Sequence, residues 1–246
     1  MCNDTHKGRI ALITGGNKGI GLETARQLGK VGMTVLLAAR NKELGEAAAA
    51  TLRDEGSNVI AIELDVTKPE TITAAASQIE EQFGCLDVLI NNAGIADQQD
   101  GSPGVASVDS VRRIFETNFF GVLAVTQAML PLVKKSDAGR IVNVSSGLGS
   151  MAFNADPEWS FAPVKLMGYN GSKVALNMLT VQLAYELRDT PIKVNATNPG
   201  YTATDLNGHA GHQTVEEGAL VEVQMALLPA DGPTGGFFSS NGSEPW

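Results

Sequence analysis

Apolar and polar positions along the chain form two alternating kinds of segment. Short runs of Val, Ile, Leu and Ala are followed by longer stretches in which apolar residues recur at helical spacing. Runs that lack alternating polar positions are typical of strands buried on both faces, and strands separated by helices pair in parallel. The predicted strands are 10–13, 35–39, 59–64, 86–90, 140–144, 193–197 and 236–238, and the predicted helices are 22–30, 42–55, 67–83, 107–135, 171–187 and 215–227.

This alternation predicts an α/β fold of the Rossmann type. We expect a doubly wound parallel sheet of about seven strands, flanked by helices in three α/β/α layers with right-handed crossovers. No Ser-, Gly- or Pro-rich linker divides the chain, so residues 1–246 are interpreted as a single domain. Two stretches interrupt the rhythm. Residues 148–168 are rich in aromatics and prolines and predict a packed lid, and residues 201–218 predict a substrate loop.

Two local signals bear on the helices. The spacing Thr67-Lys68-Pro69-Glu70 predicts a capping box with proline in the first turn, opening a helix that runs to about Phe83. In the longest helical stretch, Pro131 is expected to kink the helix or to end its last turn.

Composition and charge exclude several classes of protein. Hydrophobic residues make up 43% of the chain, which argues against disorder, and the net charge of −9 argues against a nucleic-acid partner. The polar first nine residues and the absence of a membrane-length apolar run predict a cytoplasmic protein without a membrane partner. Cys2 and Cys85 are not expected to form a disulfide. His209 and His212 are interpreted as surface-loop residues, so no metal is expected.

A glycine-rich turn, Thr14 to Gly21, lies between the first strand and the first helix. The N–H groups at a helix N-terminus lack internal partners and bind phosphate, and glycines allow the backbone to approach it. The spacing of Gly15, Gly19 and Gly21 differs from the usual Gly-x-Gly-x-x-Gly, and taken alone the turn also fits a connection without a ligand. Together with Arg40 and the tyrosine–lysine pair described next, it predicts a dinucleotide site.

Tyr169 and Lys173 are four residues apart at the start of a helix, so their side chains share one face. A phenol with a pKa near ~10 is a poor acid or base at neutral pH, whereas a nearby ammonium favours the phenolate and makes proton transfer practical. Alone, the pair also fits a solvated helix surface. Further polar or glycine-bearing residues follow other strands at the same sheet edge, where doubly wound folds bind ligands. They are Ser145 and Ser146, Asn91 to Gly94, and Pro199-Gly200.

With these residues in order, the chain resembles the short-chain dehydrogenase/reductase family over essentially its whole length. The matching pieces are Thr14-Gly15-x3-Gly19-x-Gly21, Asp65, Asn92-Ala93-Gly94, Asn118, Ser146, Tyr169-x3-Lys173 and Pro199-Gly200. The resemblance implies a catalytic set of Asn118, Ser146, Tyr169 and Lys173. It implies a cofactor-binding set of Gly15, Asn17, Lys18, Gly19, Ile20, Gly21, Arg40, Asp65, Val66, Asn92, Ala93, Gly94, Tyr169, Lys173, Pro199, Gly200, Thr202 and Thr204.

The resemblance also implies roles. Tyr169 is the acid/base, Ser146 hydrogen-bonds the substrate oxygen, and Lys173 lowers the pKa of Tyr169 and holds the nicotinamide ribose. Asn118 anchors a water in the proton path, Asp65 contacts the adenine, Asn92 lines the cofactor cleft, and Thr202 and Thr204 reach the carboxamide and the pyrophosphate. Ser146 is preferred to Ser145 because it matches the family's second serine, and strand alternation points the two side chains in opposite directions.

The second strand indicates the cofactor. NAD-binding sites usually place an acidic residue at its end for the ribose 2′-hydroxyl, but here that position is Ala39. Arg40 follows, and a guanidinium suits a 2′-phosphate. We therefore expect NADPH/NADP+ as the cofactor.

The interval from Ser146 to Tyr169 is longer than in minimal family members and resembles the monomeric, NADPH-dependent carbonyl reductase branch. A monomer is favoured, with a homodimer as the alternative.

Three functions are weighed. The leading one is an NADPH-dependent reductase of apolar ketones or aldehydes with Tyr169 as proton donor. The alternatives are a 3-oxoacyl-thioester reductase and a non-catalytic NADPH-sensing regulator.

Overall fold

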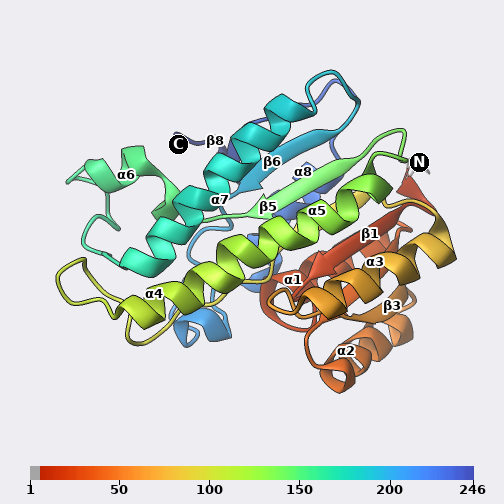
Figure 1. Cartoon of the computed structure of the whole chain (residues 1–246), viewed down its shortest axis with the longest axis horizontal. Helices are drawn as coiled ribbons and strands as arrows, with labels where there is room; N and C mark the ends of the chain where they lie inside the picture. The colour runs from red at the N-terminus through yellow and green to blue at the C-terminus, as the bar shows by residue number, and fades with distance from the viewer. Residues whose placement is uncertain (1–5) are drawn as a thin grey trace.

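The computed structural model describes residues 6–246, so Cys2 and the first part of the polar start lie outside the described residues. Its centre is one eight-stranded sheet in the order β3-β2-β1-β4-β5-β6-β7-β8 (Figure 1). All pairs are parallel except β7 with β8. The predicted doubly wound sheet is confirmed, with a short antiparallel strand added at its end. The order reverses between β1 and β4, which is where such folds form their ligand crevice.

The strands are β1 (Ile10–Thr14), β2 (Thr34–Ala39), β3 (Asn58–Glu63), β4 (Val88–Asn91), β5 (Arg140–Val144), β6 (Lys193–Thr197), β7 (Phe237–Ser239) and β8 (Gly242–Ser243). The α-helices are α1 (Gly19–Lys30), α2 (Lys42–Asp54), α3 (Pro69–Phe83), α4 (Val108–Phe115), α5 (Val122–Val133), α6 (Met151–Ala155), α7 (Met167–Glu186) and α8 (Val215–Ala226). Other helical segments of the described chain are the π-helical η2 (Glu116–Gly121) and the 3-10 turns η3 (Gly147–Gly149) and η4 (Asp205–Asn207).

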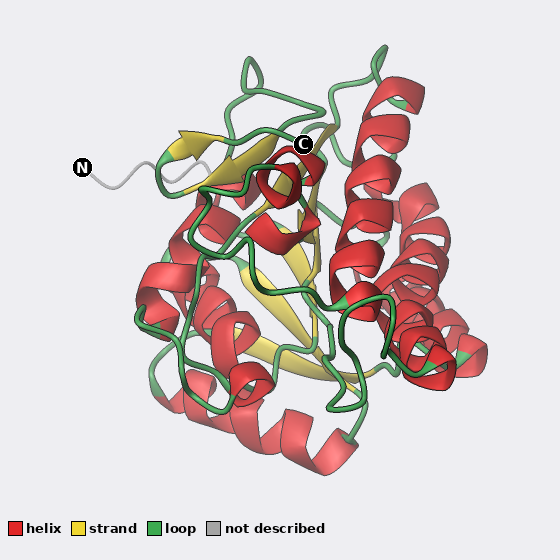
Figure 2. Ribbon diagram, turned by 90° about the vertical axis from the view of Figure 1, so that its left-hand side faces the viewer, coloured by secondary structure: helices red, strands yellow, loops and turns green. Residues whose placement is uncertain are grey.

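Helices cover both faces of the sheet (Figure 2). One core packs α3, α5 and α7 against one face, and a second packs α1, α2 and α8 against the other. Every residue of β1, β2, β4 and β5 is buried, as expected for strands enclosed on both sides. Because β1 to β6 are parallel, their carboxyl ends lie at one edge of the sheet, and the loops that leave them are brought together there.

Two sequence-based predictions about helices need correction or extension. The predicted capping box at Thr67 is wrong: Lys68 is the N-cap of α3, and the Thr67 hydroxyl donates to the Asp65 carboxylate at 2.7 Å instead. The long helical stretch is interrupted by a π-helical segment, η2, between α4 and α5. Pro131 lies in the last turn of α5, as predicted, and the helix ends at Val133 rather than at the predicted residue 135.

Three further observations concern the free cysteine, groups of metal-ligating side chains and helices of membrane-spanning length. Cys85 is a free, partly buried thiol. Within residues 6–246, no three His, Cys, Asp or Glu side chains converge into a group that could hold a metal ion. None of the helices in that range combines the length and hydropathy needed to cross a bilayer.

Candidate active site

The glycine turn after β1 is held by Asn92, which follows β4. The Asn92 side-chain amide donates to the backbone carbonyls of Thr14 and Gly15, at 2.8 and 3.2 Å. Gly15 has a positive φ of 64°, and a Cβ on Gly21 would lie only 2.3 Å from the Asn92 amide nitrogen. Glycine is therefore required at both positions, and Asn92, predicted to line the cleft, also fixes the shape of the turn.

The N-terminus of α1 is suited to an anion. The helix begins at Gly19, its N-cap Lys18 makes no side-chain cap bond, and its first turn contains no acidic residue. By contrast, α2 is capped by Asn41. The first N–H groups of α1 thus lack a side-chain acceptor and carry the positive end of the helix dipole. This uncapped first turn is therefore suited to an anionic group.

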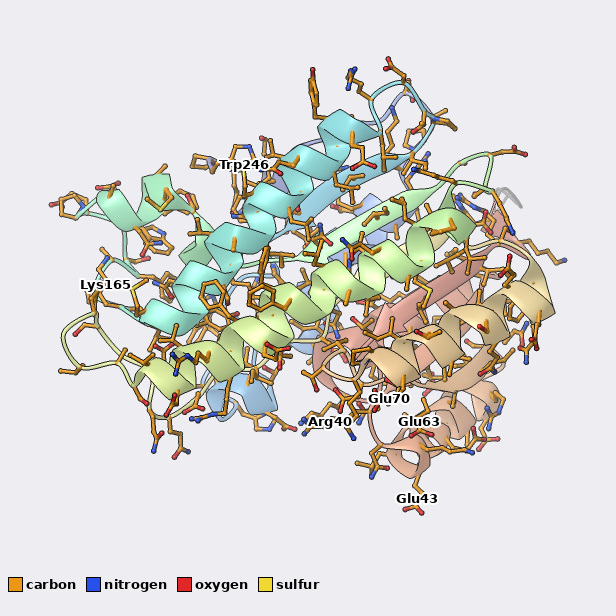
Figure 3. The ribbon with its side chains drawn as sticks, viewed as in Figure 1. Arg40, Glu43, Glu63, Glu70, Lys165 and Trp246 are labelled. Carbon is orange, nitrogen blue, oxygen red and sulfur yellow. The ribbon has the colours of Figure 1, made fainter. Side chains whose placement is uncertain are left out.

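Arg40 lies at the exposed end of β2, one residue beyond the pair formed by Ala39 and Glu63 of β3 (Figure 3). No salt bridge within the described part of the chain includes Arg40. Its guanidinium is therefore available to an anionic ligand at this edge.

Lys18 has a partner that the sequence did not predict. Its ammonium lies 2.6 Å from the carboxylate of Asp205, in η4, and His209 contacts the other oxygen of that carboxylate at 3.0 Å. The preceding residue, Thr204, packs against Gly19: its methyl carbon lies 3.5 Å from the position that a Cβ on Gly19 would take. The predicted substrate loop therefore lies over the glycine turn, and Thr204 is placed where a pyrophosphate contact was expected.

The remaining predicted cofactor residues are largely engaged with their own loops. Asp65 accepts from the N–H and the hydroxyl of Thr67. Val66 is buried, and a Cβ on Gly121 of η2 would lie 2.8 Å from one of its methyl groups. Thr202 is buried with its hydroxyl directed to the carbonyl of Pro199 at 3.3 Å, so its side chain is committed within the loop.

Asn118 is fully buried inside η2. Its side-chain amide accepts from the Ile95 N–H at 2.8 Å, donates to the Ile95 carbonyl at 3.0 Å, and also donates to the Ser172 hydroxyl. A Cβ on Gly94 would lie 3.5 Å from the Asn118 amide oxygen and 3.6 Å from the Lys173 ammonium. Asn118 therefore joins η2, the loop after β4 and α7, and Gly94 keeps the space between it and Lys173 open.

Tyr169 lies in the first turn of α7, and Asp100 holds that turn. The Asp100 carboxylate accepts from the backbone N–H groups of Gly168 and Tyr169, both at 2.8 Å, while the N-cap residue Leu166 provides no side-chain cap. A carboxylate is favoured at this positive end of the helix. Sequence reasoning missed Asp100 because the cap comes from a distant loop rather than from the residue before the helix.

The two serines after β5 face different surroundings. The Ser145 hydroxyl is buried without a hydrogen-bond partner and lies near Gly149, 3.1 Å from the position of a Cβ there. Ser146 is half-buried, and its hydroxyl accepts from the Leu148 N–H and lies close enough to Tyr169 to affect the pKa of the phenol. The expected orientation, with only Ser146 facing the tyrosine, agrees with this geometry.

The electrostatics of the pair correct one expectation. Burial raises the pKa of Tyr169 to about 12, and the Ser146 hydroxyl acts weakly in the other direction. Lys173, expected to lower that pKa, lies 5.7 Å from the centroid of the phenol ring and donates to the Val144 carbonyl at 2.8 Å. Desolvation is the larger effect on the pKa of the phenol. Tyr169 keeps its proton at neutral pH.

A second buried charge lies near Lys173. Burial lowers the pKa of Lys173 to about 8, while the carboxylate of Glu222 on α8 raises it. Glu222 is fully buried, accepts from the Thr24 hydroxyl of α1 at 2.8 Å, and leaves its other oxygen without a partner. Burial raises the pKa of Glu222 to about 8. Sequence reasoning missed Glu222, because a glutamate on an amphipathic helix is usually solvated.

Two surface hollows lie apart from these side chains. One, of about 580 Å³, lies between α2, β3 and α3 and is lined by Lys42, Glu46, Glu63 and Glu70 among others. The other, of about 410 Å³, lies over α4 and η2. Neither is lined by Ser146, Tyr169 or Lys173, so the site is defined by the converging side chains and not by these hollows.

Comparisons with known proteins agree with this geometry. The family model described as short chain dehydrogenase matches residues 9–214. The short-chain dehydrogenase anuI of Penicillium roqueforti (strain FM164) is 41% identical over 88% of both chains. Carbonyl reductase (NADPH) 1 of Mus musculus is 34% identical, covering 96% of this chain and 98% of its own. A solved NADPH-bound carbonyl reductase from chicken fatty liver superposes with a TM-score of 0.83 at 27% identity, covering 98% of this chain and all 100% of that one.

Proposed function

Since this chain belongs to the short-chain dehydrogenase family, and is therefore an oxidoreductase that uses a nicotinamide cofactor, we propose that it is an NADPH-dependent carbonyl reductase. Its substrate is a small ketone or aldehyde, which it reduces to the alcohol. The observation that carries the proposal is the convergence of three side chains at one edge of the sheet: the Ser146 hydroxyl interacts with the phenol of Tyr169, and the Lys173 ammonium lies 5.7 Å from the centre of that ring. A protonated phenol can donate its proton to the alkoxide that develops during reduction, and the phenolate can take that proton back in the reverse reaction.

Residues of this chain take defined parts in that reaction. The Ser146 hydroxyl binds the carbonyl oxygen, and Tyr169 donates its proton to that oxygen as negative charge develops there. Lys173 is held in place by the Val144 carbonyl and is proposed to bind the nicotinamide ribose. Asn118 is proposed to bind the water of the proton path through its backbone groups only, because its side-chain amide is already bonded to Ile95. When bound, the reduced nicotinamide supplies the hydride.

The first turn of α1 and the glycine turn are proposed to hold the pyrophosphate of the cofactor, with Asn92 fixing the turn. The preference for NADPH is proposed to rest on Ala39 and Arg40. Ala39 offers no acceptor to a ribose 2′-hydroxyl, and the exposed Arg40 can bind a 2′-phosphate with forked, charge-assisted bonds.

Arg40→Asp tests the cofactor preference. Loss of a charge-assisted contact worth about 1.5–3 kcal/mol should raise the Michaelis constant for NADPH about 10- to 100-fold, with a much smaller effect for NADH. Arg112→Asp, which makes the same charge change on the exposed face of α4, serves as the matched control. An unchanged Michaelis constant for NADPH in Arg40→Asp contradicts the assignment.

The reaction itself is tested by NADPH oxidation with a panel of activated ketones and aldehydes, with NADH in parallel. We expect turnover with NADPH and its loss, by about 10²-fold or more, in Tyr169→Phe, while NADPH still binds that variant. Retained reduction by Tyr169→Phe removes the tyrosine as proton donor. NADPH binding by the unmodified protein without turnover of any carbonyl compound rejects the reductase and favours a nucleotide-sensing regulator.

A further inference from the structure

Aromatic side chains form a continuous array across two segments, residues 148–168 and 201–218, that have no part in the proposed proton transfer. Phe153 stacks on Trp159 with ring centroids 5.1 Å apart, and Trp159 contacts Phe161 at 5.6 Å. Phe161 meets Tyr201 edge-on at 5.7 Å, and Tyr201 contacts His212 at 5.9 Å. The first three belong to residues 148–168 and the last two to residues 201–218. The array therefore joins the insert to the loop that follows β6.

Trp159 brings this array to the catalytic serine. Its ring atom Cζ2 lies 3.3 Å from the position that a Cβ on Gly147 would take, and Gly147 directly follows Ser146. Any side chain at Gly147 would therefore meet the indole. The edge of the indole therefore lies beside the residue that follows Ser146, the serine proposed to bind the carbonyl oxygen.

The insert that presents Trp159 is held by specific bonds. The Ser150 hydroxyl caps α6 by accepting from the Phe153 N–H at 3.1 Å, and Asn154 donates to the Leu148 carbonyl at 2.9 Å. Asn170, in the same helical turn as Tyr169, donates to Asn154 at 3.2 Å. The insert is thus bonded to the helix that carries the tyrosine, which pre-organises the aromatic face.

Charged side chains do not interrupt the array. Asp156, Glu158 and Lys165 of the insert are all exposed, and Lys165 lies at the far end of the molecule in Figure 3. Asp205, in the facing loop, is paired with Lys18. Burying a charged substrate group against these rings would cost its hydration with no compensating partner.

From this geometry we propose that Trp159, with Phe161 and Tyr201, forms a subsite that stacks a planar aromatic ring attached to the reacting carbonyl, so that aryl ketones and aryl aldehydes are the preferred substrates. Aromatic rings gain from offset or edge-on packing beyond the area they bury, whereas a saturated ring of the same size gains only the area. The substrate class rests on the proposed reductase function, but binding of the ring does not.

Binding is measured with Trp159 as its own probe. The chain has two tryptophans, so Trp246→Phe leaves Trp159 as the only one. Trp246 stacks on Phe237, 5.5 Å away, on the same side of the molecule as α6 in Figure 3, and phenylalanine retains that stacking. The variant is saturated with NADP+, so that no reduction occurs, and titrated with acetophenone or with cyclohexyl methyl ketone, its saturated counterpart. Calorimetry gives the affinity and tryptophan emission gives the location.

We expect acetophenone to quench Trp159 saturably and to bind about tenfold more tightly than the saturated ketone. Trp159→Phe, which leaves only Trp246, should show no saturable quenching, and Trp159→Leu should abolish the preference. Equal affinity for the two ketones, no measurable binding of acetophenone, or binding without a change in Trp159 emission each overturns the proposal.

Kinetics separate this proposal from the function on which it rests. With NADPH, Trp159→Leu should raise the KM for acetophenone about tenfold, with little change in kcat or in the KM for cyclohexyl methyl ketone. Tyr185→Leu, an exposed aromatic on α7 that packs on Arg188, is the matched control and should change neither. Saturable quenching without NADPH oxidation rejects the reductase and retains the aryl subsite. Reduction of both ketones with equal KM rejects the subsite and retains the reductase.

Discussion

The chemistry proposed for Tyr169 depends on how one backbone turn is held. A phenol with a pKa of about 12 donates its proton only when a substrate oxygen is correctly placed, so its position matters more than its acidity. Asp100 fixes that position by accepting from two successive N–H groups, and Gly168 allows the turn to pack against α4, since a Cβ there would lie 2.8 Å from Ile114. We infer that Asp100 is a positioning residue.

Asp100→Ala should lower kcat several-fold with little change in the KM for NADPH, and should destabilise the protein by about 1 kcal/mol through loss of the cap. Asp100→Asn keeps one carboxamide oxygen as an acceptor and should recover part of kcat. Asp97→Asn is the matched control, because Asp97 lies in the same loop but pairs with Arg113 and makes no bond to α7. Equal kinetic effects of Asp97→Asn and Asp100→Asn would remove the positioning role. Steady-state kinetics and thermal unfolding measure the two effects.

The sequence predicts the proposed reactive side chains but not their protonation state. The spacing of Tyr169 and Lys173 and the position of Ser146 were readable because they are local patterns. The pKa of Tyr169 was predicted in the wrong direction because its burial depends on packing between distant segments. Asp100 was missed for the same reason: it caps a helix 68 residues away along the chain.

For helices and strands, the prediction agrees with the structure where the sequence pattern is local and fails where the element depends on distant contacts. The strands 140–144 and 193–197 were predicted with the bounds observed, because each is a compact run between turn residues. The π-helical segment η2 was not predicted, since it accompanies the bonds of Asn118 to Ile95, which is distant in sequence. The capping box at Thr67 failed because Asp65, two residues earlier, takes its hydroxyl.

The contact between η4 and the glycine turn yields a prediction about the cofactor. The Lys18–Asp205 pair is exposed, so it contributes little to stability. In the proposed cofactor site, Asp205 would compete with a cofactor phosphate for Lys18. Asp205→Asn should therefore tighten NADPH binding about two- to fivefold and steepen its salt dependence, with unchanged thermal stability. Asp109→Asn, which breaks the exposed pair with Arg112, is the control.

Fluorescence titration of NADPH at low and high salt measures this effect. Weaker binding in Asp205→Asn would mean that the pair holds the loop closed over the cofactor rather than competing with it.

At the scale of the whole molecule, the sheet edge brings together charges from its two faces. α7 packs on one face and α8 on the other, yet Lys173 and Glu222 affect each other's pKa. The sequence predicted the layers, because they follow from hydrophobic periodicity. It could not predict that Glu222 is fully buried, because that depends on how α8 packs against Thr24 of α1.

These two groups determine how stability depends on pH. Glu222 has a pKa of about 8 when folded against an ordinary 4.5, so the folded state holds a proton that the unfolded chain releases. The free energy of unfolding therefore falls as pH rises from about 4.5 to about 8. Lys173, with a pKa of about 8 against 10.5, acts in the opposite sense: the unfolded chain binds more protons, and stability rises from about pH 8 to about pH 10.5. The two groups together are expected to give a minimum in the free energy of unfolding near pH 8.

Glu222→Gln removes the first of these windows while its carbonyl oxygen can still accept from Thr24. Relative to the unmodified protein, the variant should gain stability progressively from about pH 5 to about pH 8, on the order of 2 kcal/mol at the upper end. Urea unfolding across that range measures the difference, with the exposed Glu81→Gln on α3 as a control that should leave the profile unchanged. The same variant should lower the pKa of Lys173 further, because the carboxylate that raises it is gone. A pH-independent difference would mean that Glu222 is ionised in the folded protein throughout, and that its charge is compensated within the fold.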